Sequence, residues 1–400
     1  MKLVSAFALM LASAGLWACS GTAVTPGDDA GVDSGLAAAD AGAPDSGAID
    51  SGVEAADAGA PDLGPPDSGR TYAEAVTAAT WMELPNAPML AQGKQDDIYF
   101  TSRSRGFAVS GPTNRVMATD DGGETWREVF SHRGTYFRSI LFLDDQHGFA
   151  SNLGPIRGSG ITDPTIMYET KDGAQTWTKV STSAISGPLP PGICNQTKID
   201  AQNTIAVGRV TGPSYLLKSS DAGATWTSID LNAQLQMLID VRFTSPTEGF
   251  VVGGTAQNPM RCTILRTENG VDFSTVFTAT VANTLCWKIS FPSENVGYVS
   301  IQNAGDGEAS FAKTTDGGRT WVQKKLRSTP YGSIGIGFIT DEIGWVSGED
   351  PGDPVYRTLN GGETWEVEPN LHAPINRFRF VDERTAYAIG GSIHKLTIDW

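Results

Sequence analysis

The stretch Thr119-Asp120-Asp121-Gly122-Gly123-Glu124-Thr125-Trp126 decides the fold, because close copies of it return along the chain. Full copies occupy residues 170–177, 219–226, 314–321 and 358–365, and a shorter, degenerate copy occupies 267–273. The aromatic residues that end successive copies are 44 to 51 residues apart. This period suits a unit of four short strands and predicts the blades of a β-propeller.

Each copy is expected to form a hairpin turn with a structural task. An Asp or Asn at its third position accepts hydrogen bonds from backbone amides across the turn, and the glycines supply positive φ. The Trp then inserts between sheets. Equivalent residues in every unit indicate scaffolding, because catalysis needs different groups that converge on one spot. The residues expected in these roles are Asp121, Trp126, Asp172, Trp177, Asp221, Trp226, Asn269, Asp316, Trp321, Asn360 and Trp365.

A second pattern precedes each turn. Two aromatic residues stand seven positions apart, as in Phe142 and Phe149, and a small residue, most often Gly, comes directly before the second one. We interpret the pair as the end of an inner strand and the start of the next strand. The third unit is weaker, with Ile199 and Ile205 in place of the aromatic residues.

The number of blades follows from the two ends of the repeating region. Six turns define six blades, and residues 375–400 add three strands without a Thr-Trp strand after them. Thr80-Trp81-Met82-Glu83-Leu84 resembles Thr125-Trp126-Arg127-Glu128-Val129, so residues 79–86 are expected to supply the missing outer strand. The sequence therefore predicts an all-β domain over residues 71–400, a seven-bladed propeller of four-stranded antiparallel blades. A six-bladed ring is the alternative.

The region before the propeller is expected to consist of a targeting signal followed by a tether. Residues 1–19 combine Lys2, an apolar run and small residues before Cys19, the pattern of a secretory signal. Leu16-Trp17-Ala18-Cys19 resembles a bacterial lipobox, which implies lipidation of Cys19, and Ser20 favours the outer over the inner membrane. The alternative is an ordinary signal peptide. Residues 20–70 are rich in Ala, Asp, Gly, Pro and Ser, so a disordered tether is expected.

Charge and composition exclude several classes of function. The formal net charge of −16 makes nucleic acid an unfavourable partner. Four Cys and four His, without ligand spacing, predict no metal site and no cofactor. No Ser-centred nucleophile elbow and no phosphate-binding loop occur.

The turn Ser/Thr-x-Asp-x-Gly-x-Thr-Trp resembles the Asp-box, or bacterial neuraminidase repeat. The full unit is most similar to the photosystem II stability/assembly factor-like propellers, over roughly residues 79–400. The resemblance implies a non-enzymatic scaffold or assembly factor that binds a protein or glycan and is a monomer. The lipobox and the tether indicate a non-photosynthetic bacterium, to which the photosystem role itself would not transfer.

The alternative function is a sialidase-like glycoside hydrolase, because such enzymes share the box. Their Arg-Ile-Pro motif is absent, and Pro155-Ile156-Arg157 has the reverse order. Tyr136, Tyr331 and Asp240 are candidate residues, but nothing in the sequence makes them converge. We therefore predict no catalytic residues.

The end of the ring where inner strands begin is the predicted binding site. Counting back from each inner-strand aromatic residue places five cations there: Arg138, Arg242, Lys288, Arg377 and Arg379. Together they would attract an anionic partner. The alternative is scattered, solvated side chains that pair with neighbours such as Asp240.

Three cysteines remain in the propeller. Cys262 and Cys286 are 24 residues apart, in neighbouring blades, and are the preferred disulfide pair in an exported protein. Free buried cysteines, like the remaining Cys194, are the alternative.

Overall fold

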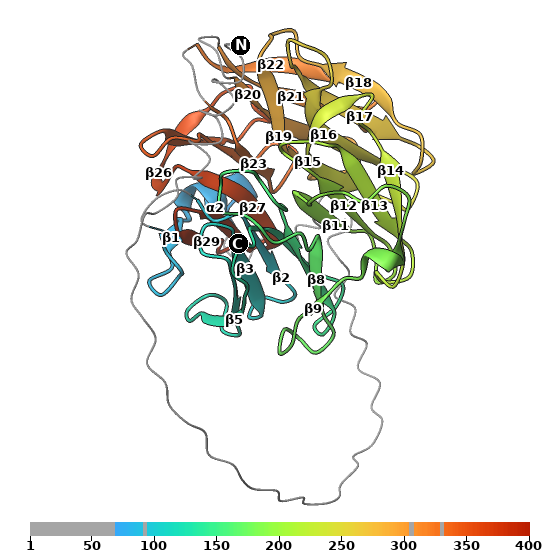
Figure 1. Cartoon of the computed structure of the whole chain (residues 1–400). Coiled ribbons are helices and arrows are strands. Elements are labelled where there is room, and N and C mark those ends of the chain that lie inside the picture. The colour runs from blue at the N-terminus through green and yellow to red at the C-terminus, as the bar shows by residue number, and fades with distance from the viewer. Residues whose placement is uncertain (1–68, 91–93, 304–307, 329–331) are drawn as a thin grey trace, which may run out of the picture.

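The computed structural model describes residues 69–90, 94–303, 308–328 and 332–400. The signal sequence, Cys19 and most of the tether lie outside these residues. Seven separate β-sheets surround a common axis (Figure 1). The prediction of a seven-bladed, all-β propeller is therefore confirmed, and the six-bladed alternative is wrong. No helix in the described part of the chain is long and apolar enough to cross a membrane.

Six blades are built from consecutive strands. The first four of these sheets comprise β2 (Asp97–Phe100), β3 (Gly106–Ser110), β4 (Arg115–Thr119) and β5 (Arg127–Ser131); β6 (Phe137–Phe142), β7 (Gly148–Asn152), β8 (Met167–Thr170) and β9 (Thr178–Lys179); β11 (Asn195–Lys198), β12 (Thr204–Gly208), β13 (Tyr215–Ser219) and β14 (Trp226–Asp230); and β15 (Leu235–Phe243), β16 (Gly249–Thr255), β17 (Cys262–Thr267) and β18 (Ser274–Thr278). The fifth and sixth comprise β19 (Thr284–Ser290), β20 (Gly297–Asn303), β21 (Ala309–Thr314) and β22 (Val322–Arg327); and β23 (Gly335–Phe338), β24 (Gly344–Ser347), β25 (Pro354–Thr358) and β26 (Glu366–His372).

The seventh blade joins the two ends of the domain. Its strand order is β1-β29-β28-β27, in which β1 (Met82–Glu83) precedes the first blade in sequence. The other members are β27 (Ile375–Asp382), β28 (Thr385–Gly390) and β29 (Ile393–Thr397). Strand β1 pairs antiparallel with β29 through Met82↔Lys395 and Glu83↔His394, so blue and red segments meet in one sheet (Figure 1). Closing the ring in this way leaves no large open edge between the first and last blades.

A short helix fastens this closure. Helix α2 (Tyr72–Ala78) begins with a capping box in which Thr71 and Glu74 exchange hydrogen bonds. The ring of Tyr72 packs edge-on against Trp400, whose indole Nε1 donates to the carbonyl oxygen of Arg70 at 3.2 Å. Trp81 is 2% exposed and lies edge-on against Trp345. The start of the domain is thus packed against its end.

The third blade has one feature that the repeat did not predict. A two-residue strand, β10 (Ile185–Ser186), pairs in parallel with β14, which makes this sheet five-stranded. It follows a single 3₁₀ turn, η1 (Thr182–Ala184). The blade thereby extends its outer edge with a segment from the preceding connection.

The aromatic pairs of the sequence pattern form the contacts between blades. Phe107 of β3 stacks on Phe142 of the next blade with ring centroids 3.9 Å apart, and Tyr298 stacks on Phe338 in the same way. The glycine before each second aromatic has a steric reason. A Cβ on Gly148 would come within 2.7 Å of the Phe142 ring, so only glycine leaves space for that ring. The hydrophobic core is consequently a series of clusters between neighbouring sheets.

Candidate functional site

The repeated turns at the blade edges have one shared geometry. In the first, the backbone amide of Thr125 donates to Asp121 Oδ1 at 2.9 Å and its hydroxyl donates to Oδ2 at 2.5 Å. The Thr119 hydroxyl oxygen accepts from the amide of Gly123 at 2.9 Å. The same arrangement recurs around Asp172, Asp221 and Asp316. These hydrogen bonds, first that of the Thr125 hydroxyl, lower the pKa of Asp121 to about 2.

Asparagine fills this position in two turns with different results. Asn360 reproduces the geometry, since its Oδ1 accepts from the Thr364 amide at 2.9 Å and its amide nitrogen donates to the Thr364 hydroxyl. Asn269, in the shortened copy, accepts instead from the amides of Val271 and Asp272. The shortened turn, which has one residue fewer, therefore keeps a capping side chain, but that side chain accepts hydrogen bonds from different backbone amides.

The tryptophans that follow these turns are all removed from open solvent to some degree. Trp226 and Trp321 are buried, and Trp126, Trp177 and Trp365 are half-buried. The indole of Trp226 donates to the carbonyl oxygen of Gly223 at 3.0 Å and packs edge-on against Phe149. Each turn thus uses its own Asp or Asn and Trp for local hydrogen bonds and packing.

The inner strands place a second, different set of residues at the centre. The first strands of the blades contact one another in the closed order β2, β6, β11, β15, β19, β23, β27 and back to β2. Seven buried charged residues lie on or next to these strands, and we call them the axial cluster. Its members are Lys94, Asp96, Asp97, Arg138, Asp240, Lys288 and Arg377.

Arg377 connects blades on opposite sides of the ring. Its guanidinium lies 3.0 Å from Asp97 Oδ1 in the first blade and 3.4 Å from both oxygens of Asp240 in the fourth. Asp97 also accepts from Arg379 at 2.9 Å. Asp240 also accepts from the backbone amides of Val241 and Ile289 at 3.1 Å. The contact is long-range in sequence and spans the axis.

Asp96 and Arg138 form the second ion pair of the cluster. Arg138 Nη1 donates to Asp96 Oδ1, and the backbone amide of Gly111 donates to Oδ2 at 3.0 Å. Lys94, beside them, donates to Asn376 Oδ1 at 2.7 Å. Three cations then surround one indole, with Lys94, Arg138 and Lys288 each 5.6 to 5.7 Å from the centroid of Trp287.

Burial controls the protonation of the two lysines. Desolvation, followed by the charge of Arg138, lowers the pKa of Lys94 to about 7. Desolvation, followed by the charge of Arg377, lowers the pKa of Lys288 well below its usual value. For Arg377 burial acts in the same direction, but Asp240 and Asp97 outweigh it and raise its pKa. The arginines pair directly with carboxylates, whereas for Lys94 the charges of Asp96 and Glu349, and for Lys288 that of Asp240, do not offset desolvation.

The structure brings the predicted cations together but not as an open basic surface. Arg138, Lys288 and Arg377 are 6%, 3% and 7% exposed, so they are not solvated, but Arg377 pairs with Asp240 as the alternative expected. Arg379 is partly exposed and pairs with Asp97, and Arg242 is half-buried on β15. Sequence reasoning missed Lys94, Asp96 and Asp97. The signal that could have found them is the adjacent acidic pair directly before an inner strand.

Two of the three candidates for glycosidase chemistry can be placed, and they have different partners. Tyr136 is buried beside Asp96, which contributes after desolvation to raising its pKa, while Tyr331 lies outside the described residues. Asp240 is 0% exposed, and its two oxygens are occupied by Arg377, by backbone amides and by Asn195. This carboxylate is committed to structure and is not free to act as an acid or a nucleophile.

The cysteines divide as a bonded pair and a single thiol. Cys262 of β17 and Cys286 of β19 form a disulfide between the fourth and fifth blades. Cys194 is free and buried, and desolvation raises its pKa. Within the described ranges no three His, Cys, Asp or Glu side chains are grouped to hold a metal ion.

Comparison with known proteins finds photosystem II assembly factors that are similar to this propeller. A model of the photosynthesis system II assembly factor YCF48 family matches residues 74–227. The chloroplastic photosystem II stability/assembly factor HCF136 of Arabidopsis thaliana is 21% identical over 351 residues, which cover 74% of this chain and 84% of that protein. The photosystem II assembly lipoprotein Ycf48 of Synechococcus sp. (strain CC9902) is 30% identical over 157 residues, 36% of this chain and 40% of that protein.

Solved structures agree on the fold. YCF48 from Cyanidioschyzon merolae superposes with a TM-score of 0.60 at 17% identity, covering 80% of this chain and 99% of that one. A structure of YCF48 bound to a D1 peptide gives a TM-score of 0.58 at 17% identity, covering 80% and 94%. Both curated relatives are named as assembly factors and not as enzymes, which supports the prediction that this chain is non-enzymatic. The chain is a seven-bladed β-propeller that is similar, over residues 74–227, to the photosynthesis system II assembly factor YCF48 family.

Proposed function

We propose that this chain is an envelope-anchored scaffold that holds an acidic segment of another protein during its assembly. The carrying observation is the convergence of three cations from different parts of the ring on Trp287. An aromatic face surrounded by cations suits a peptide with a carboxylate and apolar neighbours. The relative bound to a D1 peptide supports a protein ligand over a glycan.

The site is the end of the ring where the inner strands begin. Arg379 is its accessible edge, because 28% of its side chain is exposed although it pairs with Asp97. A hydrophobic cluster lies beside the cations and includes Trp287, Tyr136 and Ile334. A partner segment would use its acidic group for the cations and its apolar side chains for this cluster.

Lipidation of Cys19 would attach the scaffold to the membrane through residues 20–70. The Synechococcus relative is named a lipoprotein, which supports an anchor, and Ser20 favours the outer membrane. Mass spectrometry of the mature N-terminus tests this part. We expect an acylated Cys19 and a Cys19→Ser variant that is released from membranes; an unmodified Cys19 would contradict the anchor.

The binding role is tested by crosslinking the mature protein in envelope extracts. We expect one dominant protein partner, lost with Arg379→Glu and displaced by an acidic peptide from that partner. Lys179→Glu, an exposed cation on the outer strand β9, is the matched control and should retain the partner. Equal capture of the partner by both variants would contradict the proposed binding site. Capture of a glycan in a parallel array would show that the ligand is a glycan and not a protein.

A panel of fluorogenic glycosides tests the alternative function. We expect no turnover above a heat-denatured control, because Asp240 is held by Arg377 and backbone amides. Turnover that is lost with Tyr136→Phe would establish the sialidase-like alternative.

A further inference from the structure

Lys288 is the least satisfied charge in the propeller axis. It lies on β19 and is 3% exposed. Its backbone amide donates to the Ser300 hydroxyl oxygen, but its ammonium nitrogen has no hydrogen-bond or ion-pair partner among the described residues. The nitrogen lies over the Trp287 ring, 5.6 Å from the ring centroid. A buried ammonium in this state is costly unless an anion accompanies it.

The carboxylates nearby cannot serve it, because each is already used. Asp240 accepts from Arg377 and from two backbone amides. Asp97 accepts from Arg379 and lies against Arg377. Asp96 accepts from Arg138 and Gly111. The axial cluster therefore contains four buried basic groups against three carboxylates.

We propose that the axial cluster binds one small monovalent carboxylate, with Lys288 as its main ligand and Lys94 and Arg138 beside it. Once both lysines are protonated, a single negative charge balances the cluster, whereas a phosphate dianion would overcompensate it. The flat Trp287 face offers the apolar wall that the alkyl side of a carboxylate needs. The three cations that touch this ring define the place.

Binding should be coupled to proton uptake. Lys288 is faced by Asp240 from β15, Arg377 from β27, Arg138 from β6 and Lys94 from the segment before β2. Desolvation and these cations favour its neutral form, as they do for Lys94. An anion reverses that preference, so a proton is taken up with the carboxylate. Affinity should fall as pH rises above the lysine pKa values, by up to about tenfold per pH unit for each proton taken up.

The test is titration of the purified protein with sodium acetate at constant ionic strength, followed by calorimetry and thermal melting. We expect saturable binding of one acetate that weakens from pH 6 to pH 9. Lys288→Met should weaken it roughly 30-fold or more, which is the effect of removing one partner from a buried charge contact. Lys288→Arg should retain it, and the exposed control Lys179→Met should match the wild type.

A second readout keeps the proposal falsifiable without the ligand. Lys288→Met replaces a desolvated buried amine by an apolar side chain of similar length, so without acetate it should melt at the same or a higher temperature than the wild type. Acetate binding unchanged in Lys288→Met, or no binding, would overturn the proposal. Binding of chloride or phosphate that is as tight as that of acetate, or tighter, would contradict the assignment of the ligand as a carboxylate. This site shares its three cations with the proposed partner site, but free acetate needs no partner, so the acetate and crosslinking experiments can fail or succeed separately.

Discussion

The repeated turns at the blade edges, here called rim turns, and the axial cluster use the same kinds of side chain in opposite ways. In a rim turn, Asp121 bonds to Thr119 and Thr125, residues at most four positions away, and remains at the surface. In the axial cluster, Arg377 meets Asp97 and Asp240, 280 and 137 positions away, in full burial. One arrangement is repeated and local, and the other is unique and distributed over the ring. The difference teaches that repetition builds the blades while non-repeated residues tie them together.

The strongest test of this contrast is removal of the closing segment. If blades were independent, deletion of residues 71–90 would unfold one of them. Because β1 completes the seventh sheet and Trp81 and Tyr72 are buried in its cluster, we expect the whole ring to unfold cooperatively. Calorimetry and circular dichroism measure this. An unchanged melting temperature in the truncated protein would show that closure is dispensable.

The axial cluster is tested next by Asp240→Ala. The change leaves Arg377 and the Ile289 amide without their acceptor, so we expect the free energy of unfolding to fall by about 3–5 kcal/mol. Urea denaturation gives the value, with Asp272→Ala in the rim as the comparison. A loss no greater than that of the rim variant would mean that the axis is well solvated.

The disulfide offers an intermediate test, because it joins two blades covalently. Replacing Cys262 and Cys286 by Ala should lower the free energy of unfolding by about 3 kcal/mol for a loop of 24 residues. Cys194→Ala leaves the bond intact and is the control. Thiol titration in denaturant checks the premise, and three reactive thiols in the wild-type propeller would refute it.

The smallest effects are expected at a single rim turn. Asp316→Asn should lower the melting temperature by less than about 4 °C, because Asn360 already performs this task in the next blade. Asp316→Ala should cost more, since the Thr320 amide and hydroxyl lose their acceptor. A larger decrease in melting temperature for Asp316→Asn than for Asp316→Ala would show that hydrogen bonding to Thr320 is not the role of this side chain.

Low pH should distinguish a turn capped by an ionised Asp from a turn capped by a neutral Asn. The Thr320 hydroxyl and amide lower the pKa of Asp316 to about 2, below its value in the unfolded chain. The ionised cap therefore stabilises the protein above about pH 4, and this contribution is lost as pH falls towards 2. Melting temperatures of wild type and Asp316→Asn should converge at pH 2. A difference that persists there would contradict the assignment of the shift to this carboxylate.

Residue patterns predicted the fold where its causes are local. The turn from Thr119 to Trp126 and the spacing of Phe142 and Phe149 each lie within eight residues, so they could be recognised and counted. Counting back from the aromatic residues also placed Arg138, Lys288 and Arg377 near inner-strand starts. Their burial and partners could not be predicted, because Asp97 and Arg377 become neighbours only when the ring closes. The parallel strand β10 likewise depends on an irregular connection with no repeat.

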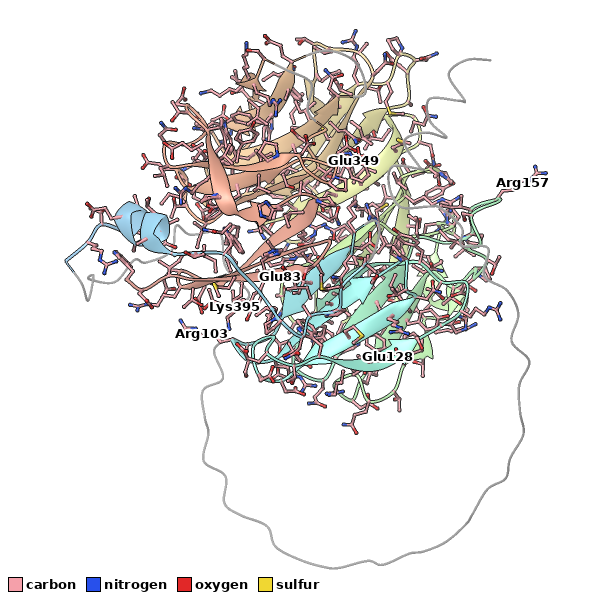
Figure 2. The ribbon with its side chains drawn as sticks, turned by 90° about the vertical axis from the view of Figure 1, so that its left-hand side faces the viewer. Glu83, Arg103, Glu128, Arg157, Glu349 and Lys395 are labelled. Carbon is pink, nitrogen blue, oxygen red and sulfur yellow. A yellow bond between two sulfur atoms is a disulfide. The ribbon has the colours of Figure 1, made fainter. Side chains whose placement is uncertain are left out.

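The packing of Trp400 against Tyr72 and Arg70 has a practical consequence for handling the molecule. Arg70 and Trp400, near the two ends of the propeller, are therefore in contact, whereas the loop of Arg157 projects away from the body of the molecule (Figure 2). A short linker that joins the two ends should permit circular permutation. The new termini could lie between any two blades, and every sheet would then consist of strands that follow one another in the chain. A fluorescent protein fused to either extremity would occupy the same place on the propeller.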